Sequence, residues 1–496
     1  MCTADGIDQD REPDLRPSTQ EENLGPSDAS GNPLKNRCAR ATGSRSAVED
    51  RASNRLTSLD AFRGLVMLLL IPDVFGGFSF YEMARRIPDS SVWTTLARNF
   101  THAPWSGATI WDLIMPAFVF MVGASMPYSY AARRREGHAH GDIVVHAALR
   151  AIALLTLGVL FLIPARHLLD SLWPVLILAL GLPVPAWLSR MFRHGAIHRS
   201  KSFEWMRWGV ILGAAAVKIA LELHRVPSFY LHDILTQAGL GYLFAFLMVD
   251  RGRRAQWWCV AAILTVYWLA FALYPLPSAD VDLSALGVMR GDEIFSGWFA
   301  HWNKGTNFAA AFDRWFLNLL PRPTPFAFNS HGYQTLNFIP TVASMVLGVM
   351  VGEHLRSDKP RAVVRNGLVV AGGLALLGGL LAGWTLAPLV KSIWTSSWVL
   401  FSTGCVVLAF TLFYHVIDVR GHRGWTFPLV VAGRNPLVLY TLAIQYRWWV
   451  LAPWRHTMGS ALAPLSWSPV LESVVCMLTL WLVALALYRA KVFVRL

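Results

Sequence analysis

Charged residues are scarce in this chain: Asp, Glu, Lys and Arg make up 15% of its 496 residues, whereas hydrophobic residues make up 54%. Soluble domains carry about 25% charged residues, because a surface in contact with water needs them. The mean hydropathy of +0.41 points the same way and excludes an ordinary soluble domain. We predict an all-α polytopic membrane protein, a bundle of about 12 transmembrane helices (roughly 11–12).

Paired cysteines are also missing. The five cysteines show no paired spacing, and three of them lie within apolar runs, so neither a disulfide framework nor a metal knuckle is expected. They are Cys2, Cys38, Cys259, Cys405 and Cys476. We therefore predict no metal cofactor.

Positive charge exceeds negative charge by 13, an excess that in a soluble protein would suggest nucleic acid as a partner. Here the Lys and Arg residues fall in short clusters between apolar runs, which is the pattern of the positive-inside rule. The 22 Trp and 12 Tyr fit aromatic belts at the two membrane interfaces. We expect the lipid bilayer, and no nucleic acid, as a partner.

Residues 1–54 hold no Phe, Tyr or Trp and are rich in Asp, Glu, Arg, Ser, Gly and Pro. Such a segment buries too little apolar surface to order itself, so we predict a disordered cytoplasmic tail. It lacks the basic, apolar and small-residue pattern of a cleaved signal peptide, and the first span is expected to act as the insertion signal. Residues 55–496 then form the transmembrane domain.

Apolar runs long enough to cross about 30 Å of hydrocarbon, which takes roughly 20 residues, recur along this domain. Two are weak: 171–189 is interrupted by Pro183 and Pro185, and 428–447 holds Arg434 and Asn435, so either is a candidate for a broken or re-entrant span. The expected spans are 58–80, 108–131, 144–164, 171–189, 206–223, 231–249, 256–275, 337–354, 366–387, 396–416, 428–447 and 468–488.

The basic residues alternate with these spans. Connections that follow even-numbered spans contain the clusters at 133–135, 190–201, 251–254, 356–365 and 420–423, whereas several opposite connections hold one base each, namely Arg166, Arg225 and Lys391. The positive-inside rule therefore predicts that both termini are cytoplasmic. Two long segments, 81–107 and 276–336, lie on the outer side, and loops of this length are usually functional or disordered. No internal repeat is evident, which disfavours a transporter built from inverted halves.

One polar motif opens the first span. Asp60 and Arg63 stand three residues apart, on one face of a helix, where they either anchor the helix at the inner surface or, together with Arg55, contact an anionic cytoplasmic ligand. Late in the same span, Asp73 precedes Gly76 and Gly77. That carboxylate either marks a helix end or orients a catalytic group at the outer side.

A second motif surrounds His102 and Asp112. Imidazole suits proton transfer near neutral pH, and a carboxylate within a span is costly unless it is paired or functional. Trp105 lies beside this His, and Pro116 predicts a kink that makes room beneath it. A lone interfacial His is often only a polar end group, but the nearby Asp favours a catalytic pair.

Polar residues also begin several later spans on the outer side, among them Gln237, Asn337 and, near the eleventh span, Asn435. Together such side chains would line a cavity; singly, each would serve as hydrogen-bonding glue between helices.

The order of these blocks resembles a known family. The segments at 55–64, 102–107, 112–123, 337–340, 347–349 and 433–436 resemble, in sequence and in order, the heparan-α-glucosaminide N-acetyltransferase family and its bacterial relatives of unknown substrate. The resemblance runs from about residue 55 to the end of the chain.

The resemblance implies transmembrane acetylation, with acetyl-CoA as acyl donor on the cytoplasmic side and an amino sugar or related glycan as acceptor on the other. The family's essential histidine matches His102. Its partner in the family is an asparagine, which falls on Asp73 here. This chain departs from the family pattern at that position, because a carboxylate cannot donate a hydrogen bond as an amide does. His102 would act as general base or carry the acyl group transiently, with Asp73 or Asp112 supporting it. Trp105, Gln237, Asn337 and Asn435 would contact the acceptor, and Arg55 and Arg63 the CoA phosphates.

Two rival functions remain at this level: a permease or exporter of a sugar-like or lipid-linked solute, and a catalytically inactive membrane scaffold. Residue patterns do not fix the acceptor, the acyl length or whether the chain forms a homo-oligomer. With no organelle address in the sequence, a bacterial cytoplasmic (inner) membrane is the expected location.

Overall fold

The structure is a computed structural model, which describes residues 56–73, 78–161, 230–278, 280–319, 322, 324–462 and 467–494, together with residues 209, 213 and 216. The chain divides into two units, residues 1–54 and 55–496, and the description below concerns the second. The expected tail, Arg55, the expected span 171–189 and all but three residues of the span 206–223 lie outside the described residues.

Helices account for most of the described residues, which contain no β-strand. The α-helices are α2 (Thr57–Asp73), α3 (Phe80–Arg86), α4 (Ser91–Asn99), α5 (Ile114–Arg135), α6 (His140–Phe161), α10 (Ile234–Phe246), α11 (Arg253–Ala272), α12 (Phe308–Phe316), α13 (Phe338–Leu355), α14 (Arg361–Thr385), α15 (Ser396–Tyr414), α16 (Phe427–Arg434), α17 (Pro436–Leu462) and α18 (Ser468–Arg489). Short 3-10 turns precede α5 (η1, Trp111–Leu113) and α13 (η7, Thr335–Asn337).

Seven described helices are long and apolar enough to cross a membrane, so the expected all-α polytopic membrane fold is confirmed. They are Trp111–Arg135, His140–Phe161, Arg253–Ala272, Thr335–Leu355, Arg361–Thr385, Ser396–Val419 and Ser468–Arg489. An eighth span is formed if α16 and α17, which bend by 68° at Asn435, are counted together, so the region 428–447 is broken where the sequence suggested. The helix α10, with 13 residues, is shorter than a usual span. The described residues leave the expected total of about 12 unconfirmed.

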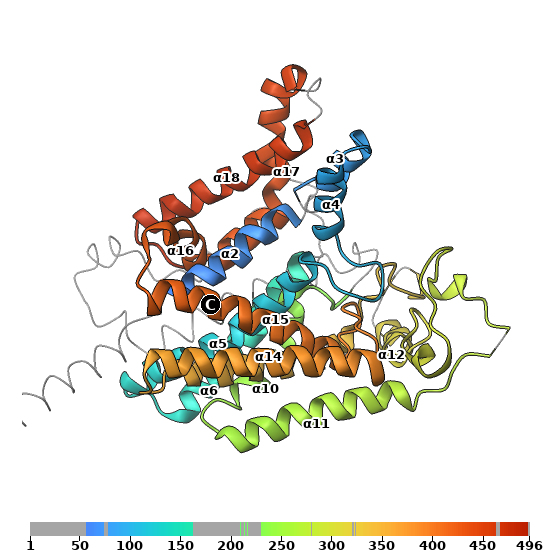
Figure 1. Ribbon diagram of the computed structural model, residues 1–496, viewed down its shortest axis with the longest axis horizontal. Coiled ribbons are helices and arrows are strands. Elements are labelled where there is room, and N and C mark those ends of the chain that lie inside the picture. The colour runs from blue at the N-terminus through green and yellow to red at the C-terminus, as the bar shows by residue number, and fades with distance from the viewer. Residues whose placement is uncertain are drawn as a thin grey trace, which may run out of the picture. The chain divides into compact units, whose positions relative to one another are not determined.

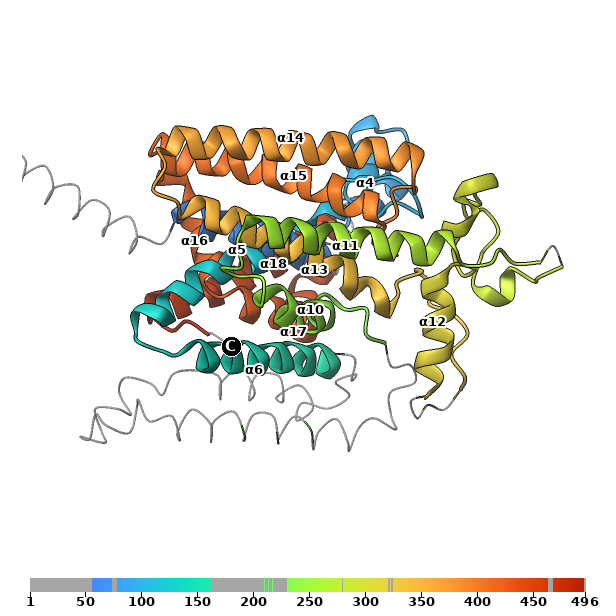
Figure 2. The same ribbon diagram turned by 90° about the horizontal axis from the view of Figure 1, so that it is seen from below.

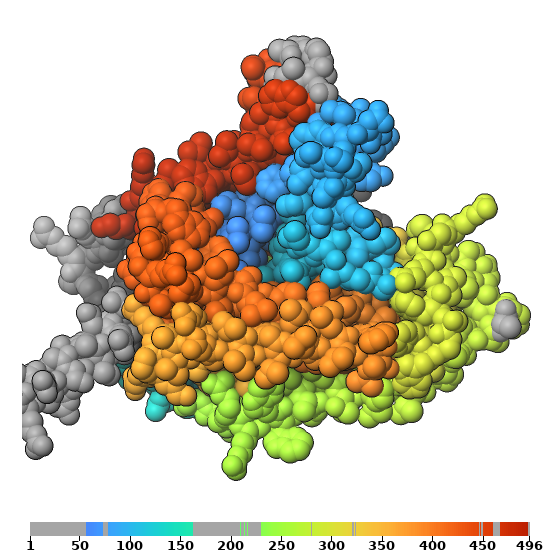
Figure 3. All heavy atoms as spheres, in the orientation of Figure 1, coloured from blue at the N-terminus to red at the C-terminus, as the bar shows by residue number. Residues whose placement is uncertain are grey.

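Four pairs of helices pack closely: α14 with α15, α5 with α13, α6 with α10, and α2 with α16. Figures 1 and 2 both show α14 and α15 running side by side, with α12 and the rest of the long segment 276–336 gathered at one end of them. The orange band in Figure 3 is largely α14 and α15. Only 17% of the apolar window of α14 is buried, and Trp384 on it is 81% exposed, as expected for a helix that faces lipid.

Glycines allow one of these pairs, α2 with α16, to approach at the backbone. A side chain at Gly64 on α2 would place its Cβ 1.7 Å from the carbonyl oxygen of Leu429 on α16, and one at Gly433 would lie 1.9 Å from the carbonyl oxygen of Asp60. Small residues at helix interfaces are typical of membrane bundles, because they let backbones approach. The segments 55–64 and 433–436, which carry part of the family resemblance, therefore have a packing role.

The helices also have chemically distinct ends. The span that begins at Trp111 ends at the triplet Arg133–Arg135, and at about 1.5 Å per residue its 25 residues cover about 37 Å. The helix α14 also differs between its two ends. It begins at Arg361, and its other end leads into the connection that holds Lys391. The side of the membrane to which each end belongs stays a prediction.

Candidate active site

The carboxylate of Asp112 organises the loop between α4 and α5. Asp112 sits in the turn η1, with its side chain 1% exposed. Its Oδ2 atom accepts hydrogen bonds from the backbone N–H of Ala103 (3.1 Å), the backbone N–H of Thr109 (3.0 Å) and the Thr109 hydroxyl (3.1 Å). A buried carboxylate is tolerated when donors surround it, and here these donors fix the loop that carries His102.

His102 contacts the other oxygen of the same carboxylate. The His102 Nδ1 atom lies 2.9 Å from Asp112 Oδ1, and the His side chain is 42% exposed. The structure thus pairs two of the three predicted catalytic residues: one is buried and fixed, and the other is reachable by a substrate. An orienting carboxylate beside an imidazole is the usual support for a general base.

Lys391 completes the group, and the sequence interpretation missed it. Its Nζ atom lies 2.9 Å from His102 Nδ1 and 3.2 Å from Asp112 Oδ1, and its side chain is only 9% exposed. The ammonium also lies over the Tyr333 ring, 5.8 Å from the centroid. The one available signal was that Lys391 is the single base of its connection, on the side where bases are few.

Two arrangements of hydrogen atoms fit these distances. In one, His102 Nδ1 donates to Asp112 and Lys391 donates to the same carboxylate, which leaves Nε2 as the basic nitrogen. In the other, Lys391 donates to Nδ1, and Nε2 carries the proton. In the first arrangement the basic nitrogen is Nε2, the ring nitrogen farther from Asp112. A general base requires this geometry.

The connection that carries Lys391 is held by the histidine loop and by α13. Ser106 and Val390 form an antiparallel bridge, and the Gly107 N–H donates to the Leu389 carbonyl at 2.9 Å. From the other side, the Asn337 amide donates to the carbonyl of Ser392 at 2.8 Å. These contacts fix the Lys391 ammonium against the imidazole of His102, which lies 289 residues earlier in the sequence.

Trp105, predicted to contact the acceptor, is 3% exposed and packs against the segment 276–336. Its indole N–H donates to the carbonyl of Trp302 at 3.2 Å, and a Cβ at Gly332 would lie 2.5 Å from its ring. The observed contacts join the histidine loop to the segment 276–336. A direct substrate contact by Trp105 stays a prediction.

Gln237 contacts the turn η7, of which Asn337 is the last residue. Both are buried, and the Gln237 amide donates to the carbonyl of Thr335 at 3.2 Å. Among the described residues the carbonyl oxygens of both side chains have no hydrogen-bond partner. Because Asn337 also holds the Lys391 connection, these two predicted substrate residues belong to the same end of the bundle as His102.

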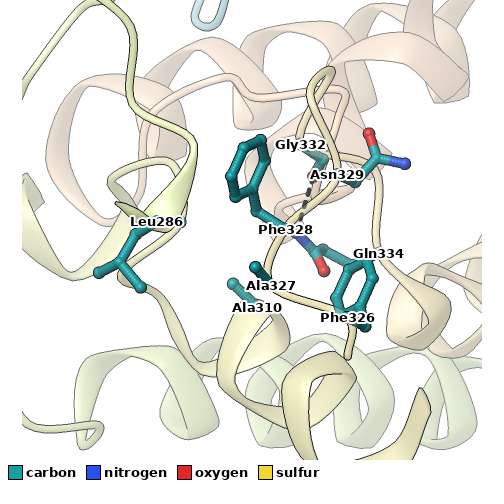
Figure 4. Close-up of a pocket in the computed structure, with 9 residues that line it drawn as sticks. Leu286, Ala310, Phe326, Ala327, Phe328, Asn329, Gly332 and Gln334 are labelled. Carbon is teal, nitrogen blue, oxygen red and sulfur yellow. Dashed lines mark hydrogen bonds between the residues drawn. The ribbon is translucent and has the colours of Figure 1, made fainter. Parts of the chain in front are cut away.

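A small cavity lies next to this turn, within the segment 276–336 (Figure 4). Its volume of about 10 Å³ suits about one water molecule. Nearby, Asp313 of α12 accepts a hydrogen bond from the Thr335 N–H at 2.9 Å and is 2% exposed. Burial raises the pKa of Asp313 to about 6, against the opposing effect of that hydrogen bond.

Three predicted site residues are not joined to this group by any described contact. The guanidinium of Arg63 contacts Asp60 at 3.5 Å and the hydroxyl of Ser125, halfway along α5, at 2.5 Å. Asn435 is fully buried and holds the C-terminal residues, as its amide donates to the Val492 carbonyl (3.1 Å) and its oxygen accepts from the Val494 N–H (2.9 Å). Asp73 ends α2, and its side chain lies outside the described residues.

No cluster of three or more His, Cys, Asp or Glu side chains that could hold a metal occurs in the described part of the chain. At this end of the bundle a histidine, a carboxylate and an ammonium are in direct contact.

Comparison with known proteins yields no matching family model, but it finds similar curated proteins. The chain is 24% identical over 463 residues to the human protein named heparan-alpha-glucosaminide N-acetyltransferase, an alignment that covers 88% of this chain and 59% of the human protein. The mouse protein of the same name is 23% identical over 408 residues, which cover 78% of this chain and 53% of the mouse protein. This chain is thus similar to both of these proteins over most of its own length. The resemblance predicted from the motifs is confirmed, and the chain spans little more than half the length of the curated relatives it matches.

Proposed function

We propose that this relative of the N-acetyltransferases is itself an integral-membrane acetyltransferase, which moves an acetyl group from cytoplasmic acetyl-CoA to an amino sugar or related glycan on the opposite side. The observation that carries the proposal is the contact of His102 with Asp112 and Lys391. A half-exposed imidazole on a buried carboxylate is equipped to take a proton. The names of the two relatives supply the reaction class.

In the proposed step, His102 Nε2 accepts a proton from the acceptor amine while the amine nitrogen attacks the thioester carbonyl carbon. A new C–N bond forms, the C–S bond of acetyl-CoA breaks, and the sulfur leaves as a thiolate that is protonated to free CoA. Asp112 stabilises the imidazolium, and Lys391 holds Asp112 in its ionised state. The nearby ammonium is also suited to stabilise the negative charge that develops on the carbonyl oxygen.

The donor is proposed to enter from the ends of the helices that carry the arginines. Arg63 is suited to a phosphate contact, since a guanidinium pairs well with phosphate oxygens. Its present partners Asp60 and Ser125 would hold it in place beside α5. Arg55 remains a second candidate from the sequence.

The test uses purified protein in proteoliposomes, radiolabelled acetyl-CoA and glucosaminide acceptors. We expect label to move to the acceptor in the wild type and to fall at least about a hundredfold in His102→Gln, because a general base contributes roughly 10²–10⁴ in rate. His138→Gln is the matched control, since His138 is half-exposed beyond the opposite end of α5. Transfer unchanged in His102→Gln would remove the proposed mechanism. Movement of a sugar without consumption of acetyl-CoA would favour the permease.

A further inference from the structure

A larger cavity lies within the outer segment, in a place that the proposed chemistry does not use. Its volume is about 220 Å³, and its lining combines apolar side chains with polar ones. The polar members are Ser278, Glu293, Asn303, Lys304 and Thr306, and the apolar members are Pro277, Val281, Leu283, Val288 and Ile294. For comparison, a cavity of about 150 Å³ accommodates benzene, so this one has room for a single six-membered ring with substituents.

The cavity is connected to the histidine loop through Glu293. The Glu293 Oε2 atom accepts hydrogen bonds from the Ser106 hydroxyl at 2.5 Å and from the Ser106 N–H at 3.3 Å. Ser106 follows His102 by four residues, and a chain spans at most about 3.6 Å per residue, so the two Cα atoms are within about 15 Å. One wall of the cavity therefore touches the loop that carries the proposed base.

The walls are held rigidly by the segment itself. The Asn303 side chain accepts from the Phe295 N–H (2.7 Å) and donates to the Phe295 carbonyl (2.9 Å). Lys304, 8% exposed, pairs with Asp292 Oδ2 at 2.9 Å, and Gly305 has a φ of +73° with the Leu286 carbonyl oxygen 2.2 Å from where a Cβ would lie. A preformed concave site with a few fixed polar groups is the usual form of a small-molecule site.

The lining suits a carbohydrate. Glu293 can accept from hydroxyl groups, Lys304 and Thr306 can donate to them, and the apolar side chains can cover the C–H face of a sugar ring. A charged ligand is less suited, because the ammonium of Lys304 is already neutralised by Asp292.

We propose that this cavity binds the sugar residue adjacent to the one that is acetylated, so that the protein selects an oligosaccharide end over a free amino sugar. The inference rests on the proposed function, since it takes His102 as the place of transfer. It assigns the segment 276–336 a role in acceptor selection.

The experiment compares two acceptors, methyl α-glucosaminide and a disaccharide ending in the same α-glucosaminide. In the wild type we expect kcat/KM at least about tenfold higher for the disaccharide, which corresponds to about 1.4 kcal/mol. Val288→Trp fills the cavity and should remove this preference while activity on the single sugar is kept. Met289→Trp is the matched control, because Met289 is adjacent, 56% exposed and outside the lining.

Thr306→Val, which keeps the side-chain volume and removes one hydroxyl, gives a second variant in case the Trp variant fails to fold, and it should lower the preference. Equal kcat/KM for both acceptors in the wild type, or an equal loss for both in Val288→Trp, would overturn the inference. If neither acceptor is acetylated, the proposed function fails, and saturation-transfer NMR with the disaccharide then tests the cavity alone. Binding lost in Val288→Trp and kept in Met289→Trp supports the cavity; no wild-type binding, or binding unchanged in Val288→Trp, overturns it.

Discussion

Replacing Lys391 by Met removes the ammonium while keeping a side chain of similar length. The change breaks contacts of 2.9 Å to His102 and 3.2 Å to Asp112, at side chains that are 9% and 1% exposed for Lys391 and Asp112. Breaking a buried ion pair costs about 3–5 kcal/mol of folding stability, and because Asp112 keeps the donors of Ala103 and Thr109 we place that cost at about 3 kcal/mol. Removing a donor that stabilises the developing oxyanion costs about a hundredfold in rate, so we expect kcat/KM to fall by about that factor.

The assay is the acetyl-transfer reaction, together with thermal unfolding in detergent. Lys359→Met makes the same chemical change at an exposed position in the connection between α13 and α14 and should leave both readouts unchanged. Wild-type kcat/KM in Lys391→Met would refute the reasoning.

Two further predictions concern stability. Gly64→Ala should lower the unfolding free energy by about 1–3 kcal/mol or more, because its Cβ would meet the Leu429 carbonyl oxygen at 1.7 Å. Gly373→Ala, where nothing lies within 4 Å of the added Cβ, should raise the unfolding free energy by about 0.5–1 kcal/mol. Equal effects of the two variants in thermal unfolding would contradict the packing of α2 on α16. Burial raises the pKa of Asp313 from 3.8 to about 6, so the folded state holds this proton more tightly than the unfolded chain does. The protonated Asp313 therefore contributes about 3 kcal/mol to the free energy of unfolding below about pH 4, and this contribution is lost as the pH rises through about 6. Asp313→Asn should flatten that decline in melting temperature, and a wild type that becomes more stable over the same range would contradict it.

The membrane fold could be predicted from the sequence because its signal is local. Apolar runs, charge depletion and the positions of arginines each report on a few neighbouring residues, and ten of the twelve expected spans coincide with described helices. The break at Asn435 could be anticipated for the same reason, since Arg434 and Asn435 are polar within an apolar run.

The site could be predicted only in part, because it is assembled from distant segments. His102 and Asp112 are ten residues apart, so their pairing was within reach of a local interpretation. Lys391 joins them from the connection between α14 and α15 through a bridge between Ser106 and Val390, which no local pattern reveals. The interpretation of Asn435 illustrates the converse, because a buried amide looks the same in sequence whether it contacts a substrate or, as observed, the C-terminal backbone.

The central claim is that His102 delivers an acetyl group at the end of the bundle opposite the arginine clusters. It is tested most directly by sealed vesicles of known orientation, with radiolabelled acetyl-CoA supplied only on the face of the Arg133–Arg135 cluster and the glucosaminide only on the other. The account predicts labelled acceptor on the far side in the wild type and none in His102→Gln. Labelled acceptor only when donor and acceptor share one side, or equal labelling in His102→Gln, would contradict it.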